Sequence, residues 1–199
     1  MTVTFIWDLD GTLIDSYGAI LNSLEVAYAA HQLPFERQQV KSYILKTSVG
    51  QLFKELKKEK DLDLYPLYAQ SLETRNHEIE LIEGAEDILA WAKEQKIEQF
   101  IYTHKGDNAF VLLKDLGLDG YFKEILTADR GLKRKPDPEG VDYLLDKYQL
   151  DKATTYYIGD RPLDVDVALN SGIKSINFCD YKLEQSQKIG HLLDIKNLL

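Results

Sequence analysis

Short apolar runs alternate with longer amphipathic segments along most of the chain. The apolar runs lie at residues 3–7, 99–102, 124–127, 154–158 and 175–178. Runs this short, rich in β-branched and aromatic residues, are typical of strands buried on both faces. Between them, helical spacing predicts helices over residues 85–95, 108–116, 138–148 and 163–171. This alternation predicts an α/β fold: a doubly wound parallel sheet with right-handed crossovers.

Between Asp15 and about Glu80 the apolar period is helical throughout. Apolar side chains from Tyr17 to Tyr28 recur at helical spacing, which predicts one helix that ends before Pro34. Shorter helical patterns follow at residues 40–45, 52–56 and 67–72, and no strand is predicted in this stretch. We therefore expect an α/β core made of residues 1–15 and 84–199, with a small α-helical domain of residues 16–83 inserted into it.

Composition narrows the class of protein. The chain has 199 residues, of which 44% are hydrophobic, enough for a sizeable core. A net charge of −9 argues against a nucleic-acid partner. The N-terminus runs directly into a strand and no stretch has the length of a membrane span, so we expect a soluble, cytoplasmic protein without a membrane partner. The single cysteine, Cys179, excludes an intrachain disulfide. The sequence allows a monomer or a homodimer.

Two carboxylates, Asp8 and Asp10, directly follow the first predicted strand. Open α/β sheets bind ligands beyond the carboxyl ends of their strands. Two acids this close repel one another unless a cation neutralises them, and Mg²⁺ takes few protein carboxylates together with water and phosphate oxygens. Gly11 permits a sharp turn after them. Taken alone, the motif is also compatible with a solvated acidic turn.

Polar residues follow three further predicted strands. Thr103 ends the second strand, Lys135 precedes a helix after the third, and Asp160 follows the fourth with Asp164 four residues later. Each has a structural alternative: a turn or helix cap for Thr103, a solvated loop for Lys135, and a helix-start acid that favours the helix dipole for Asp164. This alternative is weakest for Asp160.

Together the motifs resemble those of the haloacid dehalogenase superfamily of phosphohydrolases. The matching segments are Asp8-Leu9-Asp10-Gly11-Thr12, Thr103, Lys135-Pro136-Asp137-Pro138 and Gly159-Asp160 to Asp164. The chain looks most like the branch that contains phosphoglycolate phosphatase and β-phosphoglucomutase. This resemblance spans essentially the whole chain. It implies the strand order 5-4-1-2-3 and identifies residues 16–83 as a helical cap between the first and second motifs.

The resemblance also implies a mechanism. Asp8 attacks phosphorus to form an aspartyl phosphate, while Asp10 protonates the leaving group and later deprotonates a water. Mg²⁺ is held by Asp8, the backbone carbonyl of Asp10 and Asp160, with Asp164 as a further or water-mediated ligand. Thr103 and Lys135 bind the phosphoryl oxygens. Further residues expected to bind phosphate or substrate are Gly11, Thr12, His104, Lys105, Ser48 and Gly50.

The implied substrate is a small phosphorylated metabolite. Thr12 favours hydrolysis, because the mutases often carry an apolar residue there, and Asp10 argues against a dehalogenase. Two alternatives remain: a sugar phosphomutase, and a noncatalytic phosphate-binding module like a signalling receiver domain. The latter also combines paired acids, Thr and Lys on a doubly wound sheet.

Four positions stay open on the sequence alone. His104 stands where the related phosphatases often have Asn or Ser, and it either contacts substrate or caps the following helix. Residues 47–50 resemble the loop that closes over the leaving group, or form an ordinary interhelix turn. Arg75 and His77 face the site in one interpretation and lie on a solvated surface in the other.

Overall fold

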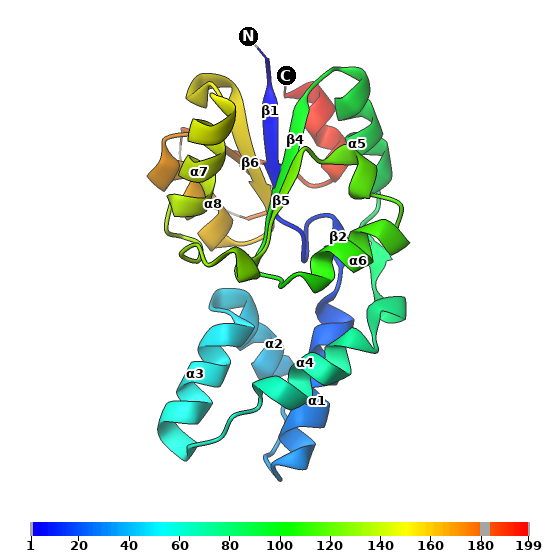
Figure 1. The fold of residues 1–199 in the computed structure, drawn as a ribbon, viewed down its shortest axis with the longest axis vertical. Helices are drawn as coiled ribbons and strands as arrows, with labels where there is room; N and C mark the ends of the chain where they lie inside the picture. Colours follow the sequence, from blue (N-terminus) through cyan, green and yellow to red (C-terminus); the bar gives the residue numbers. More distant parts are fainter. Residues whose placement is uncertain (1, 180–183, 199) are drawn as a thin grey trace. The chain divides into compact units, whose positions relative to one another are not determined.

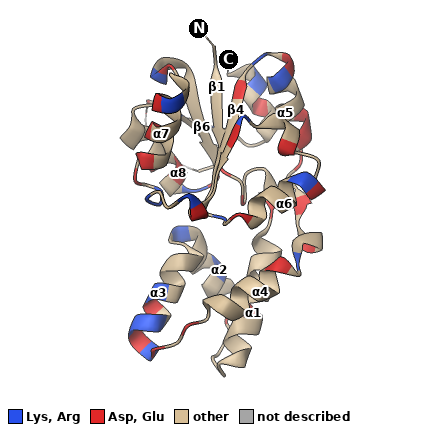
Figure 2. Ribbon diagram, in the orientation of Figure 1, with Lys and Arg blue, Asp and Glu red and all other residues tan. Residues whose placement is uncertain are grey.

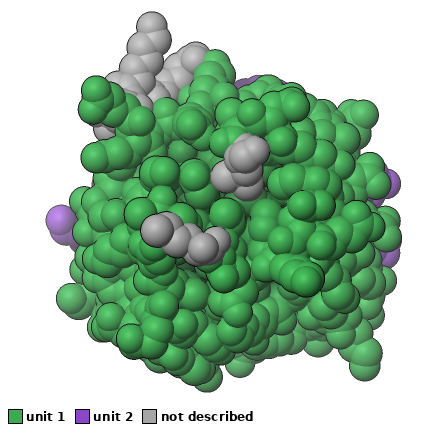
Figure 3. Space-filling model, turned by 90° about the horizontal axis from the view of Figure 1, so that it is seen from above, with its two compact units in different colours: residues 1–14, 81–199 green, residues 15–80 purple. Residues whose placement is uncertain are grey.

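A computed structural model describes residues 2–179 and 184–198, and it divides the chain into two compact units (Figure 3). Unit 1 consists of Met1–Ile14 with Leu81–Leu199, and unit 2 of Asp15–Glu80. The expected boundaries, after residue 15 and before residue 84, lie close to these. The identification of unit 1 as a catalytic core and of unit 2 as a cap stays a prediction.

Unit 1 is built on one parallel six-stranded sheet. Its strands are β1 (Thr4–Trp7), β4 (Glu98–Tyr102), β5 (Glu124–Leu126), β6 (Thr155–Gly159), β7 (Lys174–Asn177) and β8 (Ser186–Lys188). The spatial order is β5-β4-β1-β6-β7-β8. When the first five strands of this sheet, β1, β4, β5, β6 and β7, are numbered 1 to 5 along the chain, their spatial order from β7 to β5 is 5-4-1-2-3. The sequence did not predict β8, because Ser186–Lys188 is polar and becomes a strand only by pairing with β7.

Helices cover both faces of this sheet, so the predicted doubly wound α/β fold is confirmed. Figure 1 shows α7 and α8 on one side of the strands and α5 with the C-terminal segment on the other. The α-helices are α5 (Ala85–Glu94), α6 (Asn108–Asp115), α7 (Glu139–Tyr148) and α8 (Pro162–Ser171). Short 3₁₀ turns complete the unit: η2 (Asp119–Tyr121), η3 (Ala128–Arg130), η4 (Lys152–Thr154) and η5 (Leu192–Asn197).

Side chains from the central strands are buried on both faces. Ile6 and Tyr157 pack in a cluster with α7 and α8. On the α5 side, the indole of Trp7 donates to Gln99 Oε1 (3.2 Å), and the Gln99 amide donates to the carbonyl of Leu89 in α5 (3.0 Å). The buried amide is therefore satisfied. Figure 2 shows β1 free of charged residues, whereas charged residues are frequent on the helices of this unit. Each fully buried apolar side chain contributes roughly 1.5–3 kcal/mol.

Unit 2 is helical. Its elements are α1 (Tyr17–Ala30), α2 (Arg37–Lys46), α3 (Val49–Lys60), α4 (Tyr65–Glu73) and the 3₁₀ turn η1 (Asn76–Glu78). Their apolar faces form one buried cluster, centred on side chains such as Leu24 and Ile44. Across the described residues, no helix combines the length and apolar content needed to cross a membrane.

The segments that join the units form two short strands, β2 (Ile14–Asp15) and β3 (Glu80–Leu81), which pair as a separate sheet. The expectation that this stretch contains no strand was wrong at these two places. A two-residue strand carries no period, so only the pairing defines it.

Candidate active site

The site lies where β1 ends. The backbone N–H of Asp8 donates to the carbonyl of Ile158 (2.8 Å), which continues the β1–β6 pairing to the edge of the sheet. The chain then turns sharply at Gly11, whose φ is 85°, and the Gly11 N–H donates to the carbonyl of Ile14 (2.8 Å). Glycine adopts this left-handed conformation without steric cost. The turn fixes the Asp8 carboxyl at the carboxyl end of the two central strands.

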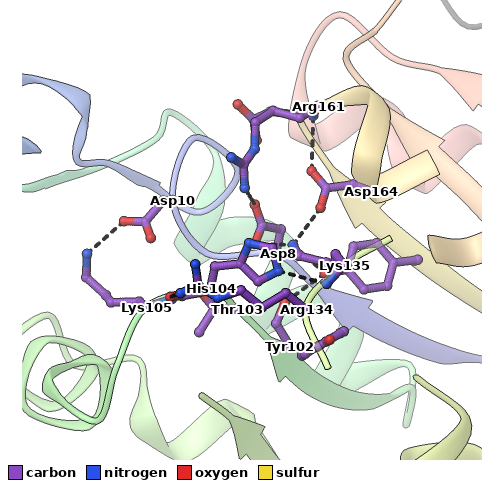
Figure 4. Close-up of polar contacts among 12 residues, drawn as sticks. Asp8, Asp10, Tyr102, Thr103, His104, Lys105, Arg134, Lys135, Arg161 and Asp164 are labelled. Atoms are coloured by element: carbon purple, nitrogen blue, oxygen red, sulfur yellow. Dashed lines mark hydrogen bonds and ion pairs between the residues drawn. The ribbon is translucent and has the colours of Figure 1, made fainter. Parts of the chain in front are cut away.

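Lys135 is the centre of the polar cluster. Its ammonium donates to Asp8 Oδ1 (2.8 Å), to Asp164 Oδ1 (2.6 Å) and to the hydroxyl of Tyr157 (2.9 Å), as Figure 4 shows for the two carboxylates. The Lys135 side chain is fully buried, and both carboxylates are at most 1% exposed. A buried ammonium is tolerated only when its hydrogens are all bonded. Here three acceptors take its three hydrogens.

The surroundings of Asp8 perturb its pKa. Burial raises its pKa to about 6 and the Asp164 carboxylate acts in the same direction, whereas Lys135 and Arg161 lower it. Its Oδ1 accepts from Lys135. Its Oδ2 is buried and accepts no hydrogen bond within the described part of the chain, with Arg161 Nη2 3.9 Å away. A buried anionic oxygen without a donor is a favourable place for a cation.

The carboxylates around Asp8 fit a divalent ion. Asp8, Asp160 and Asp164 each offer an oxygen, and these oxygens lie within 4.8 Å of one another. Such a set repels itself unless a cation lies between its members, and an all-oxygen set suits Mg²⁺. Together with the donor-free Oδ2 of Asp8, this donor set fits the metal that the resemblance implies. The Asp10 carboxylate is not part of this set.

Asp164 has two structural roles in α8. Its Oδ2 accepts from the backbone N–H of Arg161 (3.1 Å), so it caps the first turn, as the helix-start interpretation predicts. Its Oδ1 binds Lys135. Gly159 makes this placement possible, since a Cβ at that position would lie 2.3 Å from the Cβ of Asp164.

Thr103 and Lys105 form contacts that the sequence did not predict. The backbone N–H of Thr103 donates to the carbonyl of Leu126 (2.9 Å). The Thr103 hydroxyl accepts from the backbone N–H of Lys105 (3.1 Å). The Lys105 ammonium pairs with Asp10 Oδ1 (2.9 Å), and the two side chains are 6% and 18% exposed. In the structure, Lys105 therefore forms an ion pair with Asp10.

His104 does not cap the following helix, which corrects one of its two expected roles. The residue before α6 is Asp107, and the ring of His104 points instead to the third motif, where its Nε2 accepts from the backbone N–H of Lys135 (2.9 Å). Burial lowers the pKa of His104 to about 2, and the charges of Lys135 and Arg134 act in the same direction. The ring is therefore neutral.

The remaining candidates are Thr12, Ser48, Gly50, Arg75 and His77. The Thr12 side chain is fully buried, and its hydroxyl has no hydrogen-bond partner among the described residues. Ser48 caps α3 by accepting from the N–H of Gln51 (3.0 Å). Gly50 lies in the first turn of α3, so the loop expected over residues 47–50 is shorter than predicted. In unit 2, Arg75 pairs with Glu78 (2.5 Å), and His77 is exposed.

Tyr157 is a site residue that sequence reasoning missed. Tyr157 accepts from Lys135 and donates to the backbone carbonyl of Tyr102 (2.7 Å), and burial raises its pKa well above the ordinary value. Arg161 lies against Asp8. The available signal for Tyr157 was its position inside a buried strand, because a buried phenol needs a hydrogen-bond partner.

Known proteins are similar to this chain in sequence. The family model described as "Haloacid dehalogenase-like hydrolase" matches residues 5–178. A phosphoglycolate phosphatase from Nitrosococcus oceani is 27% identical, covering 96% of this chain and 94% of its own. The pyrophosphatase PpaX of Listeria monocytogenes is also 27% identical, over 84% of this chain and 79% of its own.

Solved structures of other proteins are also similar to this chain. The core domain of a candidate phosphoglycolate phosphatase from Streptococcus pneumoniae is 38% identical with a TM-score of 0.61, covering 100% of this chain and 95% of that one. A candidate phosphoglycolate phosphatase from Lactobacillus plantarum shares the fold at a TM-score of 0.86 and 22% identity, with both chains covered completely. By the family match and these relatives, the chain belongs to the haloacid dehalogenase-like hydrolases.

Proposed function

We propose that this hydrolase is a Mg²⁺-dependent phosphatase that cleaves a phosphomonoester of a small metabolite through a phosphorylated Asp8. One observation carries the proposal. Asp8 lies buried at the end of β1 with one oxygen held by Lys135 and the other free of hydrogen-bond donors among the described residues, next to Asp160 and Asp164. The relatives named phosphoglycolate phosphatase and pyrophosphatase also act on small phosphorylated compounds by their names.

Asp8 is the proposed nucleophile. A bond forms between its carboxylate and phosphorus while the bond from phosphorus to the ester oxygen breaks. Lys135 and Arg161 favour the ionised carboxylate, since both lower the pKa of Asp8. Lys135 also holds Oδ1 in a fixed direction, which reduces the motion that the nucleophile must lose before attack.

Asp10 is the proposed general acid and base. It gives a proton to the departing ester oxygen, and later takes a proton from the water that attacks phosphorus and releases Asp8. Its carboxyl is partly exposed, unlike that of Asp8, and the Lys105 ammonium fixes one of its oxygens. The products are the alcohol and inorganic phosphate.

Asp8, Asp160 and Asp164 would hold Mg²⁺, with the backbone carbonyl of Asp10 as a further ligand. When bound, the ion would offset the negative charge of the carboxylates and of the phosphoryl group. The Thr103 hydroxyl and the Lys135 ammonium are proposed to bind the phosphoryl oxygens, and Lys135 would exchange one of its three present acceptors for this contact. Unit 2 is proposed to act as a cap that selects the leaving group.

The test is steady-state phosphate release from a panel of phosphomonoesters, including phosphoglycolate, hexose phosphates and p-nitrophenyl phosphate, with Mg²⁺ and with chelator. Wild type is compared with Asp8→Asn and with the control Asp115→Asn, an exposed acid at the end of α6. We expect turnover that needs both the metal and Asp8 and that is unchanged in the control. Folded wild-type protein without metal-dependent turnover on any ester would refute the proposal.

A further inference from the structure

His104 joins the loops that follow β4 and β5. Its Nε2 accepts from the backbone N–H of Lys135 (2.9 Å), and its own carbonyl accepts from Arg134 Nη2 (3.3 Å). Figure 4 shows the ring beside the start of the Lys135 side chain. The backbone of the third motif is thus held to the residue that follows Thr103.

The placement of this backbone decides where the Lys135 ammonium lies. That group bonds Asp8, Asp164 and Tyr157 at distances between 2.6 and 2.9 Å, so it has little positional tolerance. A lysine side chain has four flexible torsions, and its backbone must be fixed for its end to be fixed. The hydrogen bond from Lys135 N to His104 Nε2 supplies that constraint at the root of the side chain.

The His104 ring is suited to accepting a hydrogen bond from the protein backbone and is not suited to binding a ligand. It is neutral, because burial lowers the pKa of His104 to about 2. The tautomer that fits the contact carries its hydrogen on Nδ1, and that nitrogen is buried without a partner among the described residues. Neither ring nitrogen is therefore open to a phosphoryl group, which argues against the substrate contact considered from the sequence.

The unpartnered Nδ1 also argues against a purely structural role. A buried donor without an acceptor opposes folding. An apolar side chain of similar size would fill the same space without this cost. What such a side chain lacks is the acceptor for Lys135.

We propose that His104 is a positioning residue whose Nε2 anchors the Lys135 backbone and thereby aligns the Lys135 ammonium between Asp8 and Asp164. The effect on activity rests on the proposed phosphatase function. The hydrogen bond from Lys135 N to His104 Nε2 is independent of that function.

The matched variants are His104→Leu, which removes the acceptor, and His104→Gln, whose side-chain oxygen reaches about as far as Nε2. Asp115→Asn, a change at the exposed acid that ends α6, is the control. We expect His104→Leu to lower kcat by about 10- to 100-fold with KM changed less, since a displacement of about 1 Å has effects of this size. His104→Gln is expected to recover most of kcat, and the control to match wild type.

Crystal structures of wild type and His104→Leu keep the test independent of activity. We expect the Lys135 ammonium to leave at least one of its two carboxylates in the Leu variant. An unmoved Lys135, or an active wild type with unchanged kcat in His104→Leu, would overturn the inference. If the proposed function is wrong, wild-type protein will show no metal-dependent turnover. In that case the position of the Lys135 ammonium in the two crystal structures alone tests the role of His104.

Discussion

Removing the charge of Asp8 should stabilise the metal-free protein at neutral pH. The pKa of this acid is raised from 3.8 to about 6, chiefly by burial. Below pH 3.8 the acid is protonated in both states and contributes nothing to stability. As the pH rises, the unfolded state loses its proton first, so the folded state loses relative stability until about pH 6. The whole loss is about 3 kcal/mol, since one pKa unit corresponds to about 1.36 kcal/mol.

Asp8→Asn removes this cost while keeping an oxygen that accepts from Lys135. The figure of about 3 kcal/mol is an upper limit at pH 8 without metal, because the substitution also deprives Lys135 of one of its two carboxylates. At pH 4.5 the same two pKa values leave a cost of only about 1 kcal/mol. We therefore expect Asp8→Asn to be more stable than wild type at pH 8, and the difference to shrink on acidification.

The assay is urea unfolding followed by far-UV circular dichroism, at pH 4.5 and pH 8 with EDTA, with Asp115→Asn as control. Added Mg²⁺ should remove most of this difference, because an ion that binds only the folded state stabilises it by about 2.7 kcal/mol at 100 times Kd, and the variant lacks one of its ligands. Wild type as stable as Asp8→Asn at pH 8 in EDTA would refute the electrostatic reasoning.

Three further substitutions test single contacts. Lys105→Met removes the ammonium that pairs with the proposed general acid, and kcat for phosphate release should fall about 10- to 100-fold; an unchanged kcat contradicts the role given to that pair. Gly159→Ala places a Cβ 2.3 Å from that of Asp164 and should destabilise the protein by about 1–3 kcal/mol in urea, which an unshifted midpoint would disprove. Tyr157→Phe leaves one hydrogen of the Lys135 ammonium without its acceptor and should cost about 1–3 kcal/mol by the same assay; unchanged stability would contradict the weight given to this contact.

The sequence by itself determined the buried strands, the amphipathic helices and the end of the sheet where the site lies. Period and residue type distinguish buried strands such as Thr4–Trp7 from amphipathic helices such as Tyr17–Ala30. Because the carboxyl ends of parallel strands meet at one edge, residues that follow different strands were expected together. The structure places Asp8, Lys135 and Asp164 in direct contact there.

Only the tertiary structure decided which group contacts which. Lys105 and Lys135 are both basic residues in loops beyond strands, yet one pairs with Asp10 and the other with Asp8 and Asp164. No local pattern separates them, because each contact joins residues far apart in the chain. The roles of His104 and Tyr157 are hidden for the same reason. Local sequence encodes period and helix ends, whereas hydrogen-bond partners depend on distances that exist only after the strands have paired.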